Sequence, residues 1–290
     1  MSIQALPFGP VWEALKGYKA FASSTPVSFD HKISHTPISH RSKMAAIVID
    51  VFRSTTTALT CVAAGSLGIY LAAKSKTGKH DLTPPFGATT DWICGGEEHG
   101  LAIAGGVLAN SPLEVIPQVV SGKFVKFFST NGAKALDAVE NSGMGELFLA
   151  GLPNIALTAL EAQRRGADVI WFVCGGFYES LTLEDMVCVG RGVQALLDSG
   201  FLSPDQLDDE ARISLLAATC YAGNDIRLIK DLQGAQVGTL LQNIGKAADV
   251  AASLAGHGMF PGLWDRMSAT ILVRTKISGV SVFVPEWTGC

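Results

Sequence analysis

The sequence lacks a long hydrophobic run, since no stretch reaches the roughly 18 consecutive apolar residues of a membrane-spanning helix. It also lacks an excess of basic residues: 22 lysines and arginines stand against 26 aspartates and glutamates, for a net charge of -4. The first absence predicts no membrane partner, and the second gives no electrostatic footprint for nucleic acid. The first residues show no basic start followed by an apolar block, so we expect no secretory signal.

Paired cysteines are absent as well. The six cysteines form no C-x-x-C pair, which disfavours structural zinc and a redox dithiol. Most of them stand in apolar surroundings, where we expect buried free thiols. Unpaired thiols favour a reducing compartment, so the protein is predicted to be cytoplasmic.

Several nucleotide-binding and hydrolase motifs are missing. The chain has no G-x-x-x-x-G-K-[ST] phosphate loop, no G-x-G-x-x-G after its first predicted strand, no G-x-S-x-G elbow and no H-E-x-x-H. These absences disfavour a nucleoside triphosphatase, a dinucleotide-dependent dehydrogenase and a serine hydrolase.

What is present is a repeated pattern of apolar run, polar loop and helix. The chain has 290 residues, of which 48% are hydrophobic and 17% charged, enough for a sizeable core. Four apolar runs, each followed by a helical pattern, are "AAIVIDV", "FVKFFS", "GELFLAG" and "DVIWFVC". Repeated strand–helix units predict an α/β fold with a mostly parallel sheet and helices on both faces.

The two ends of the chain depart from this pattern. Residues 1–43 are polar with little apolar periodicity, so we predict an N-terminal extension that lies as a loop on the surface. Residues 44–290 would form the α/β domain. After further helices, "SATILVRTKISGVSVFVPEW" predicts two strands joined at Gly279, antiparallel at a sheet edge, the second ending at Pro285.

Ligands of open α/β sheets bind outside the carboxyl ends of the strands, so polar residues there are informative. The segment "DVFRSTTT" places Asp50, Arg53 and Ser54 at such an end, followed by the hydroxyls of Thr55, Thr56 and Thr57. Arginine and a helix start both favour an anion. The alternative is a helix cap with an Asp50–Arg53 pair, but three consecutive threonines are poor helix formers, which favours a site.

Two further strand ends carry polar residues. The segment "STNGAKAL" brings Ser129, Thr130, Asn131 and Gly132, which also suit a tight turn. The segment "CGGFYESLTLED" starts a helix, for which Thr182 is the expected N-cap and Asp185 its capping-box partner. That cap accounts for neither Glu184 nor the glycines Gly175 and Gly176, which would let a ligand approach the backbone.

A fourth cluster, "CGGEEHGLAIAGGVLANSPLEV", is predicted as a glycine-rich lid or binding loop. It contains Glu97, Glu98, Asn110 and Ser111. If Glu97 lies near Asp50 and Asp185, the three carboxylates would offer the hard oxygen ligands that Mg²⁺ prefers.

With these loops identified, the chain resembles the 2-phosphosulfolactate phosphatase family. The matching segments, in order, are "VIDVFRSTTT", "GGEEHGLAIAGGVLANSPLEV", "FFSTNGAKAL" and "CGGFYESLTLEDMVCVG". The resemblance covers about residues 44 to 250. It implies Mg²⁺-dependent hydrolysis of the phosphate ester of a 2-hydroxy acid that bears a sulfonate. It places Asp50, Arg53, Thr55–Thr57, Asn131, Glu184 and Asp185 on the family's motif positions.

The departures from that family fall in the predicted site loops. Glu98 stands where the family usually has an arginine, and Ala109 and Ala133 replace a glycine and a threonine. The stretch before "LED" is bulkier here, with Phe177 and Tyr178. These changes suggest a relative whose substrate is less acidic or larger, or whose reaction has changed.

Three hypotheses remain open. The first is a Mg²⁺-dependent phosphatase acting on a small 2-hydroxy acid-like ester. The second is the same fold used in specialised metabolism for an acid/base reaction without metal, and the third is a binding protein without catalysis. In each case the partner is a small molecule, and the sequence leaves a homo-oligomer open.

For the catalytic hypotheses we assign residues to three roles. The catalytic candidates are Asp50, Arg53, Glu184 and Asp185, and the metal ligands are Asp50, Glu97 and Asp185. The substrate-binding candidates are Ser54, Thr55, Thr56, Thr57, Glu98, Asn110, Ser111, Ser129, Thr130, Asn131, Gly132, Gly175 and Gly176.

Overall fold

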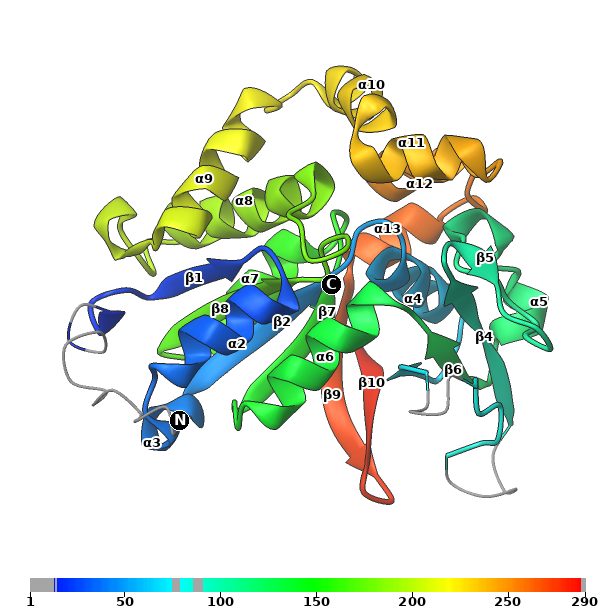
Figure 1. Ribbon diagram of the computed structural model, residues 1–290, viewed down its shortest axis with the longest axis horizontal. Coiled ribbons are helices and arrows are strands. Elements are labelled where there is room, and N and C mark those ends of the chain that lie inside the picture. Colours follow the sequence, from blue (N-terminus) through cyan, green and yellow to red (C-terminus); the bar gives the residue numbers. More distant parts are fainter. Residues whose placement is uncertain (1–12, 14, 75–78, 86–90, 288–290) are drawn as a thin grey trace, which may run out of the picture.

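A computed structural model describes residues 13, 15–74, 79–85 and 91–287 (Figure 1). Within these residues the strands form a ten-stranded sheet in the order β1-β8-β2-β7-β9-β10-β3-β6-β4-β5, flanked by helices. The predicted α/β class is confirmed. None of the helices in the described part combines the length and apolar character needed to cross a bilayer.

Two groups of parallel strands make up most of the sheet. The first contains β1 (Ala20–Ser23), β8 (Val169–Cys174), β2 (Met44–Ile49) and β7 (Glu146–Ala150). The second contains β3 (Gly68–Ala72), β6 (Phe124–Phe128) and β4 (Trp92–Glu98), with the short β5 (Leu101–Ala102) antiparallel at the edge. Most of these strands are the apolar runs expected of buried parallel strands, whereas β4 contains two glycines and two glutamates.

The hairpin of β9 (Thr270–Ile277) and β10 (Val280–Trp287) joins the two groups. Its antiparallel pairing is confirmed, but its predicted place at a sheet edge is wrong, because β9 pairs with β7 and β10 with β3. Pro285 does not end the second strand either. The pairing of β10 with β3 is limited to Phe283, so among the described residues the side of β10 that faces away from β9 has no partner strand at Pro285. The missing N–H of the proline therefore costs no hydrogen bond of the sheet.

The hairpin also reverses the strand direction. The pairings β7–β9, β9–β10 and β10–β3 are all antiparallel, so the two parallel groups run in opposite directions. Their carboxyl ends nevertheless meet. Gly132, just after β6, lies so close to Asp50, just after β2, that a methyl group added to the glycine would be 2.9 Å from Oδ2 of Asp50. Polar loops from both groups therefore come together at one place.

Helices cover both faces of the sheet, as predicted. One apolar cluster packs α7 (Ile155–Arg164) and α8 (Leu183–Asp198) against the sheet. The other packs α2 (Pro26–Ser34), α4 (Ser54–Ala63) and α6 (Asn131–Asn141) against the opposite face. Neighbouring residues of β8 show the division, since Trp171 belongs to the second cluster and Phe172 to the first.

Helices from the last third of the chain lie along the top of the view in Figure 1, coloured yellow to orange. They are α9 (Asp209–Cys220), α10 (Asp225–Gly234), α11 (Gln236–Asn243) and α12 (Ala248–Ala255), and α13 (Leu263–Ser268) follows against α4. The described residues also form the short helices α3 (Ile38–Arg41) and α5 (Pro117–Val120) and two 3₁₀ turns at Pro112–Glu114 and Pro204–Gln206.

The prediction of a loop over residues 1–43 is wrong for residues 20–41, while residues 1–12 and 14 lie outside the described part of the chain. The four buried residues of β1 pair with β8 and extend the sheet. Thr25 then caps α2 by accepting a hydrogen bond from the Ser28 amide at 3.1 Å, with Pro26 in the first turn. Threonine followed by proline is a helix-start signal that the low apolar periodicity obscured.

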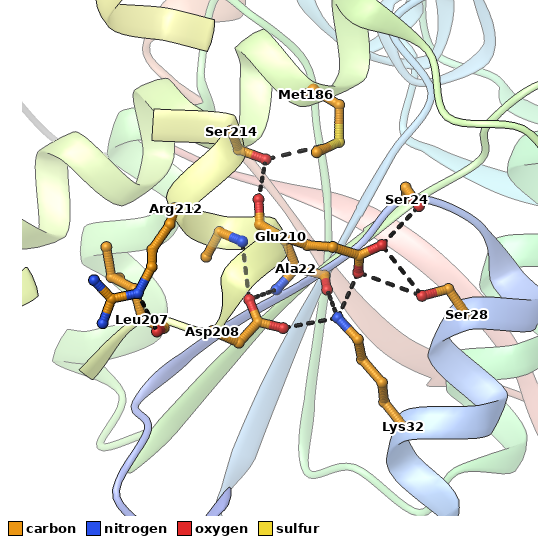
Figure 2. A network of polar contacts seen from close by, with 11 residues as sticks. Ala22, Ser24, Ser28, Lys32, Met186, Leu207, Asp208, Glu210, Arg212 and Ser214 are labelled. Atoms are coloured by element: carbon orange, nitrogen blue, oxygen red, sulfur yellow. Dashed lines mark hydrogen bonds and ion pairs between the residues drawn. The ribbon is translucent and has the colours of Figure 1, made fainter. Parts of the chain in front are cut away.

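An ionic network fastens this N-terminal segment to α9 (Figure 2). The Lys32 ammonium on α2 lies 2.7 Å from Oδ2 of Asp208, donates to the Ala22 carbonyl at 2.6 Å, and also pairs with Glu210. Ser24 donates to Oε1 of Glu210 at 2.8 Å. Residues about 180 positions apart in sequence are thereby joined.

Candidate active site

A cavity of about 250 Å³ lies where the carboxyl ends of the two strand groups meet. It is bounded by the loops after β2, β4, β6 and β8, and by α11. Its lining consists of Asp50, Phe52, Arg53, Glu97, His99, Gly100, Asn110, Thr130, Asn131, Phe177, Tyr178, Val237, Leu240 and Leu241. Five of the predicted site residues and the predicted ligand Glu97 are thus brought to one cavity.

Asp50 is a buried carboxylate of the cavity lining, with 6% of its surface exposed. Its Oδ2 accepts a hydrogen bond from Oγ of Ser54 at 2.9 Å, at the first residue of α4. Burial, the largest cause, and the charge of Glu97 raise the pKa of Asp50 to about 6, although hydrogen bonds from Ser54 and Gly132 lower it. A carboxyl group with this pKa can gain or lose a proton near neutral pH.

Arg53 is fixed by partners on two other elements. Its Nη1 lies 2.6 Å from Oδ2 of Asp249 on α12, and its Nη2 donates to the Gly100 carbonyl at 2.8 Å. Oδ1 of Asp249 in turn accepts from Oγ of Ser111 at 2.6 Å. Arg53 and Asp249 are both almost fully buried, so the guanidinium is held in one orientation at the cavity wall.

Glu97 connects the segments that follow β4 and β6. Its Oε2 accepts from the Gly100 amide and its Oε1 from the Thr130 amide, both at 2.7 Å. The segment Cys94–Glu98 was predicted as part of a loop, but it belongs to β4. Its two glycines allow that strand because side chains there would collide with Leu108 and Phe128.

Asn110 carries an unpaired acceptor on the cavity lining. It is 4% exposed, and its Oδ1 has no hydrogen-bond partner within the described residues. A buried carbonyl oxygen without a partner is costly unless a ligand supplies a donor. This position therefore favours a ligand with a hydroxyl or another hydrogen-bond donor.

Thr130 and Asn131 line the cavity at the start of α6. The tight turn considered for Asn131 and Gly132 is wrong, because both residues belong to the first turn of this helix. The N-terminus of α6 faces the same cavity as Asp50, and such a helix end favours an anion.

Asp185 and Glu184 lie behind the cavity wall. Oδ1 of Asp185 accepts from the Val51 amide at 2.9 Å and Oδ2 from the Gly176 amide at 3.3 Å. Burial, followed by the Asp50 charge, raises the pKa of Asp185 to about 7. Burial and then the Asp185 charge raise the pKa of Glu184 well above its usual value. Thr182 occupies the N-cap position of α8 as predicted, but its side chain makes no capping hydrogen bond. The predicted capping box is wrong, because Asp185 accepts from the β2 and β8 loops instead.

The hydroxyls after Asp50 face the protein rather than the cavity. Oγ1 of Thr55 donates to the Asp50 carbonyl at 2.9 Å, and Oγ1 of Thr56 donates to the Val51 carbonyl at 3.0 Å. Ser54 and Thr57 are likewise fully buried. The threonine run therefore holds the β2–α4 loop, and its contact with substrate stays a prediction.

The glycines after β8 lie close to neighbouring groups. A methyl group on Gly175 would lie 3.2 Å from Cβ of Asp50, and Gly176 has a φ of 61° with the Ser180 and Ser24 carbonyls close by. Both glycines thus bring the β8 loop against Asp50, and neither lines the cavity.

The remaining predicted residues lie around the cavity. Ser129 accepts from the Gly132 amide at 3.2 Å, and Ser111 supports Asp249. Glu98 turns outward to pair with Lys74, and its carboxylate lies 4.0 Å from the His80 ring. It is absent from the described lining of the cavity.

The predicted metal ligands do not form a cage of protein groups. Among the residues described, no three histidine, cysteine, aspartate or glutamate side chains are grouped to hold a metal ion. Both oxygens of Glu97 and both of Asp185 already accept backbone N–H groups. Mg²⁺ commonly takes one or two carboxylates together with phosphate oxygens and waters. Of the predicted ligands, only Asp50 lines the cavity without backbone N–H donors on both oxygens in the hydrogen bonds of the described residues, so Asp50 would hold Mg²⁺ if substrate oxygens and waters completed the site.

Sequence reasoning missed Asp249, which holds Arg53, and several residues of the cavity lining. Asp249 gave one signal, an acidic residue within the apolar segment "AADVAASLA". The apolar wall of Phe52, Val237, Leu240 and Leu241 gave none, because these side chains look like ordinary core residues.

Known proteins are similar to this chain over most of its length. The family described as 2-phosphosulpholactate phosphatase matches residues 31–257. A probable 2-phosphosulfolactate phosphatase of Thermosynechococcus vestitus is 29% identical over 211 residues, which cover 71% of this chain and 82% of the relative. One of Deinococcus radiodurans, with the same name, is 31% identical over 236 residues, or 80% and 92% of the two chains.

Proposed function

The chain belongs to the 2-phosphosulfolactate phosphatase family, and we propose that it hydrolyses the phosphate monoester of a small organic 2-hydroxy acid in the presence of Mg²⁺. The observation that carries this proposal is the position of Asp50. It lies in a cavity beside the N-termini of α4 and α6 and next to the fixed guanidinium of Arg53. The size of the cavity supports a small-molecule substrate, and the unpaired cysteines of the described residues support a cytoplasmic enzyme.

Each group has a role in this reaction. Arg53 and the N-terminal amides of α6 would bind the phosphate oxygens, on which negative charge is concentrated. Oδ1 of Asn110 would accept a hydrogen bond from the organic part of the ester or from a bound water. Asp185 would act as a positioning residue, because it fixes the backbone of Val51 and Gly176 on either side of Asp50.

The reaction transfers the phosphoryl group to water. A water oxygen attacks phosphorus, and the bond from phosphorus to the ester oxygen breaks. The attacking water loses one proton and the leaving oxygen takes up one from solvent, so the products are the alcohol and hydrogen phosphate. Asp50 would orient the attacking water from inside the cavity. When bound beside Asp50, Mg²⁺ would supply neutralisation of the phosphate oxygens.

The test is phosphate release from 2-phosphosulfolactate, phospholactate and a mixed panel of esters, with Mg²⁺ and with EDTA. We expect release that requires Mg²⁺ and that falls roughly 100-fold or more in Asp50→Asn. Asp198→Asn, an exposed change on α8, is the matched control and should leave the rate unchanged. No release from any ester would overturn the proposal.

The second candidate, an acid/base reaction without metal, is favoured by one observation. Asp50 and Asp185 have pKa values raised to about 6 and about 7, a range suited to proton transfer at neutral pH. It predicts turnover of a substrate without phosphate that survives EDTA, which separates the two candidates.

A further inference from the structure

The cavity has two walls of opposite character. Its polar wall, described above, surrounds Asp50, and its other wall consists of Phe52, Phe177, Tyr178 and the α11 side chains Val237, Leu240 and Leu241. Resting on the proposed phosphatase activity, we infer that the substrate carries an apolar group, such as an aryl or branched alkyl group, in place of a second acidic group. This group would pack between Tyr178 and Leu240.

Part of the apolar wall is free to take a ligand. Val237 and Leu241 are 5% and 2% exposed and belong to the core. Tyr178, by contrast, is 70% exposed, and Phe177 and Leu240 are partly exposed. Burying such a surface against a ligand would favour binding through the hydrophobic effect.

The charges around the cavity argue against a second acidic group. Among the described lining residues Arg53 is the only lysine or arginine, and its guanidinium already pairs with Asp249. Two carboxylates, Asp50 and Glu97, share the lining. A phosphate can use Arg53 and the α6 N-terminus. A sulfonate beside it would lose its hydration and would find only the His99 ring as a further basic group of the described lining.

The turn that carries Tyr178 is built in an unfavourable backbone conformation. The Phe177 amide donates to the Ser180 carbonyl at 2.9 Å, and the Ser180 amide donates back at 3.0 Å. Between them Tyr178 and Glu179 have φ angles of 48° and 57°, in the left-handed region that non-glycine residues seldom adopt. Conformations of this kind gather at ligand sites. Here the turn projects Tyr178, edge-on to the Phe177 ring, at the cavity mouth.

A neighbouring cavity is lined by cations, which could bind a second acidic group. It holds about 200 Å³, shares Glu97 and Thr130 with the first, and is also lined by Lys74 and Lys134. Lys74 pairs with Glu98, and the Lys134 ammonium lies 4.0 Å from Oε1 of Glu179. Both cations therefore have carboxylate partners, so the apolar wall is the better match for the organic group. A substrate with a second anion would compete with Glu98 for Lys74.

The experiment compares kcat/KM for phospholactate, for its 3-phenyl derivative and for 2-phosphosulfolactate, each with Mg²⁺. We expect the phenyl ester to exceed phospholactate by about 10-fold or more. The ratio of the two kcat/KM values should fall several-fold in Tyr178→Ala and in Leu240→Ala. Leu216→Ala, which truncates a 66% exposed leucine on α9, is the matched control and should leave the ratio unchanged.

Equal values for the phenyl ester and phospholactate would overturn the inference while leaving the phosphatase proposal intact. A preference for 2-phosphosulfolactate that is lost in Lys134→Gln would also overturn it and would assign the acidic group to the neighbouring cavity. Release from none of the three esters would instead count against the phosphatase itself.

Discussion

At the scale of single residues, Arg53 depends on a partner far away in the sequence. Asp249 lies 196 positions later and holds Nη1 of Arg53 at 2.6 Å, with both side chains almost fully buried. Removing one charge of a buried pair leaves the other without compensation, at a cost of about 3 to 5 kcal/mol. We expect Asp249→Asn to lose that much free energy of unfolding in urea titrations and to raise KM more than it lowers kcat.

The exposed ion pair of Arg191 and Asp225, at 2.7 Å, provides the control. Because water screens this pair, Asp225→Asn should change the unfolding free energy by about 1 kcal/mol or less and leave KM unchanged. If Asp249→Asn behaves like Asp225→Asn, the assignment of Asp249 as the positioning residue of Arg53 is wrong.

The residue scale also shows how far sequence reasoning reaches into the site. Asp50, Arg53, Asn110, Thr130 and Asn131 could be predicted because polar residues at strand ends meet at the edge of a parallel sheet. The direction of each side chain could not be predicted. From the sequence, the hydroxyls of Ser54 and the three threonines were predicted to bind a ligand. In the structure the Ser54 hydroxyl donates to the Asp50 carboxylate, and those of Thr55 and Thr56 donate to backbone carbonyls.

At the scale of elements, α2 and α9 are joined through Lys32. Burial raises the pKa of Asp208, while the neighbouring Lys32 charge and hydrogen bonds lower it. Lys32→Met would leave the nearly buried Asp208 carboxylate without its cation, so we expect a loss of about 1 to 3 kcal/mol of unfolding free energy near neutral pH. Lys16→Met removes an exposed pair with Glu13 and should cost less than about 0.5 kcal/mol.

The pH dependence of this loss follows from the sign of the pKa shift. Without Lys32, the pKa of Asp208 in the folded protein rises further above its unfolded value, so the folded state binds a proton more tightly. The destabilisation should then be largest above the folded pKa and should shrink as the pH falls toward the unfolded value. Urea titrations at several pH values check this, and a loss that grows toward acid pH would contradict it.

Elements also differ in how well the sequence predicts them. The strands β2, β6, β7 and β8 were found because each is a long apolar run between a turn and a helix. The strand β1 was missed, since four residues carry too little periodicity and its burial depends on pairing with β8, about 150 positions later. The central place of the β9–β10 hairpin was missed for the same reason, because strand order is a property of long-range pairing.

At the scale of the whole molecule, the active site depends on the junction between the two strand groups. The sheet joins them through β10 and β3, which pair at Phe283 and Ile69. Phe283 is fully buried in the cluster that also contains Ile69 and Phe127. Asp50 comes from one group, while Glu97, Thr130 and Asn131 come from the other. A shift at the junction would therefore separate the two halves of the cavity.

Because of this dependence, we expect two Phe→Ala variants of the core to differ in phosphatase activity. Phe283→Ala and Phe29→Ala each remove a fully buried phenyl ring, at about 3 to 5 kcal/mol. Phe29 packs edge-on against Trp171 at 5.5 Å, within the first strand group and away from the junction. At a temperature where both variants are folded by circular dichroism, we expect Phe283→Ala to lose phosphatase activity at least 10-fold, because misplaced groups lose rate steeply. Phe29→Ala should retain it, and equal losses in both variants would show that the cavity responds to overall stability rather than to the junction.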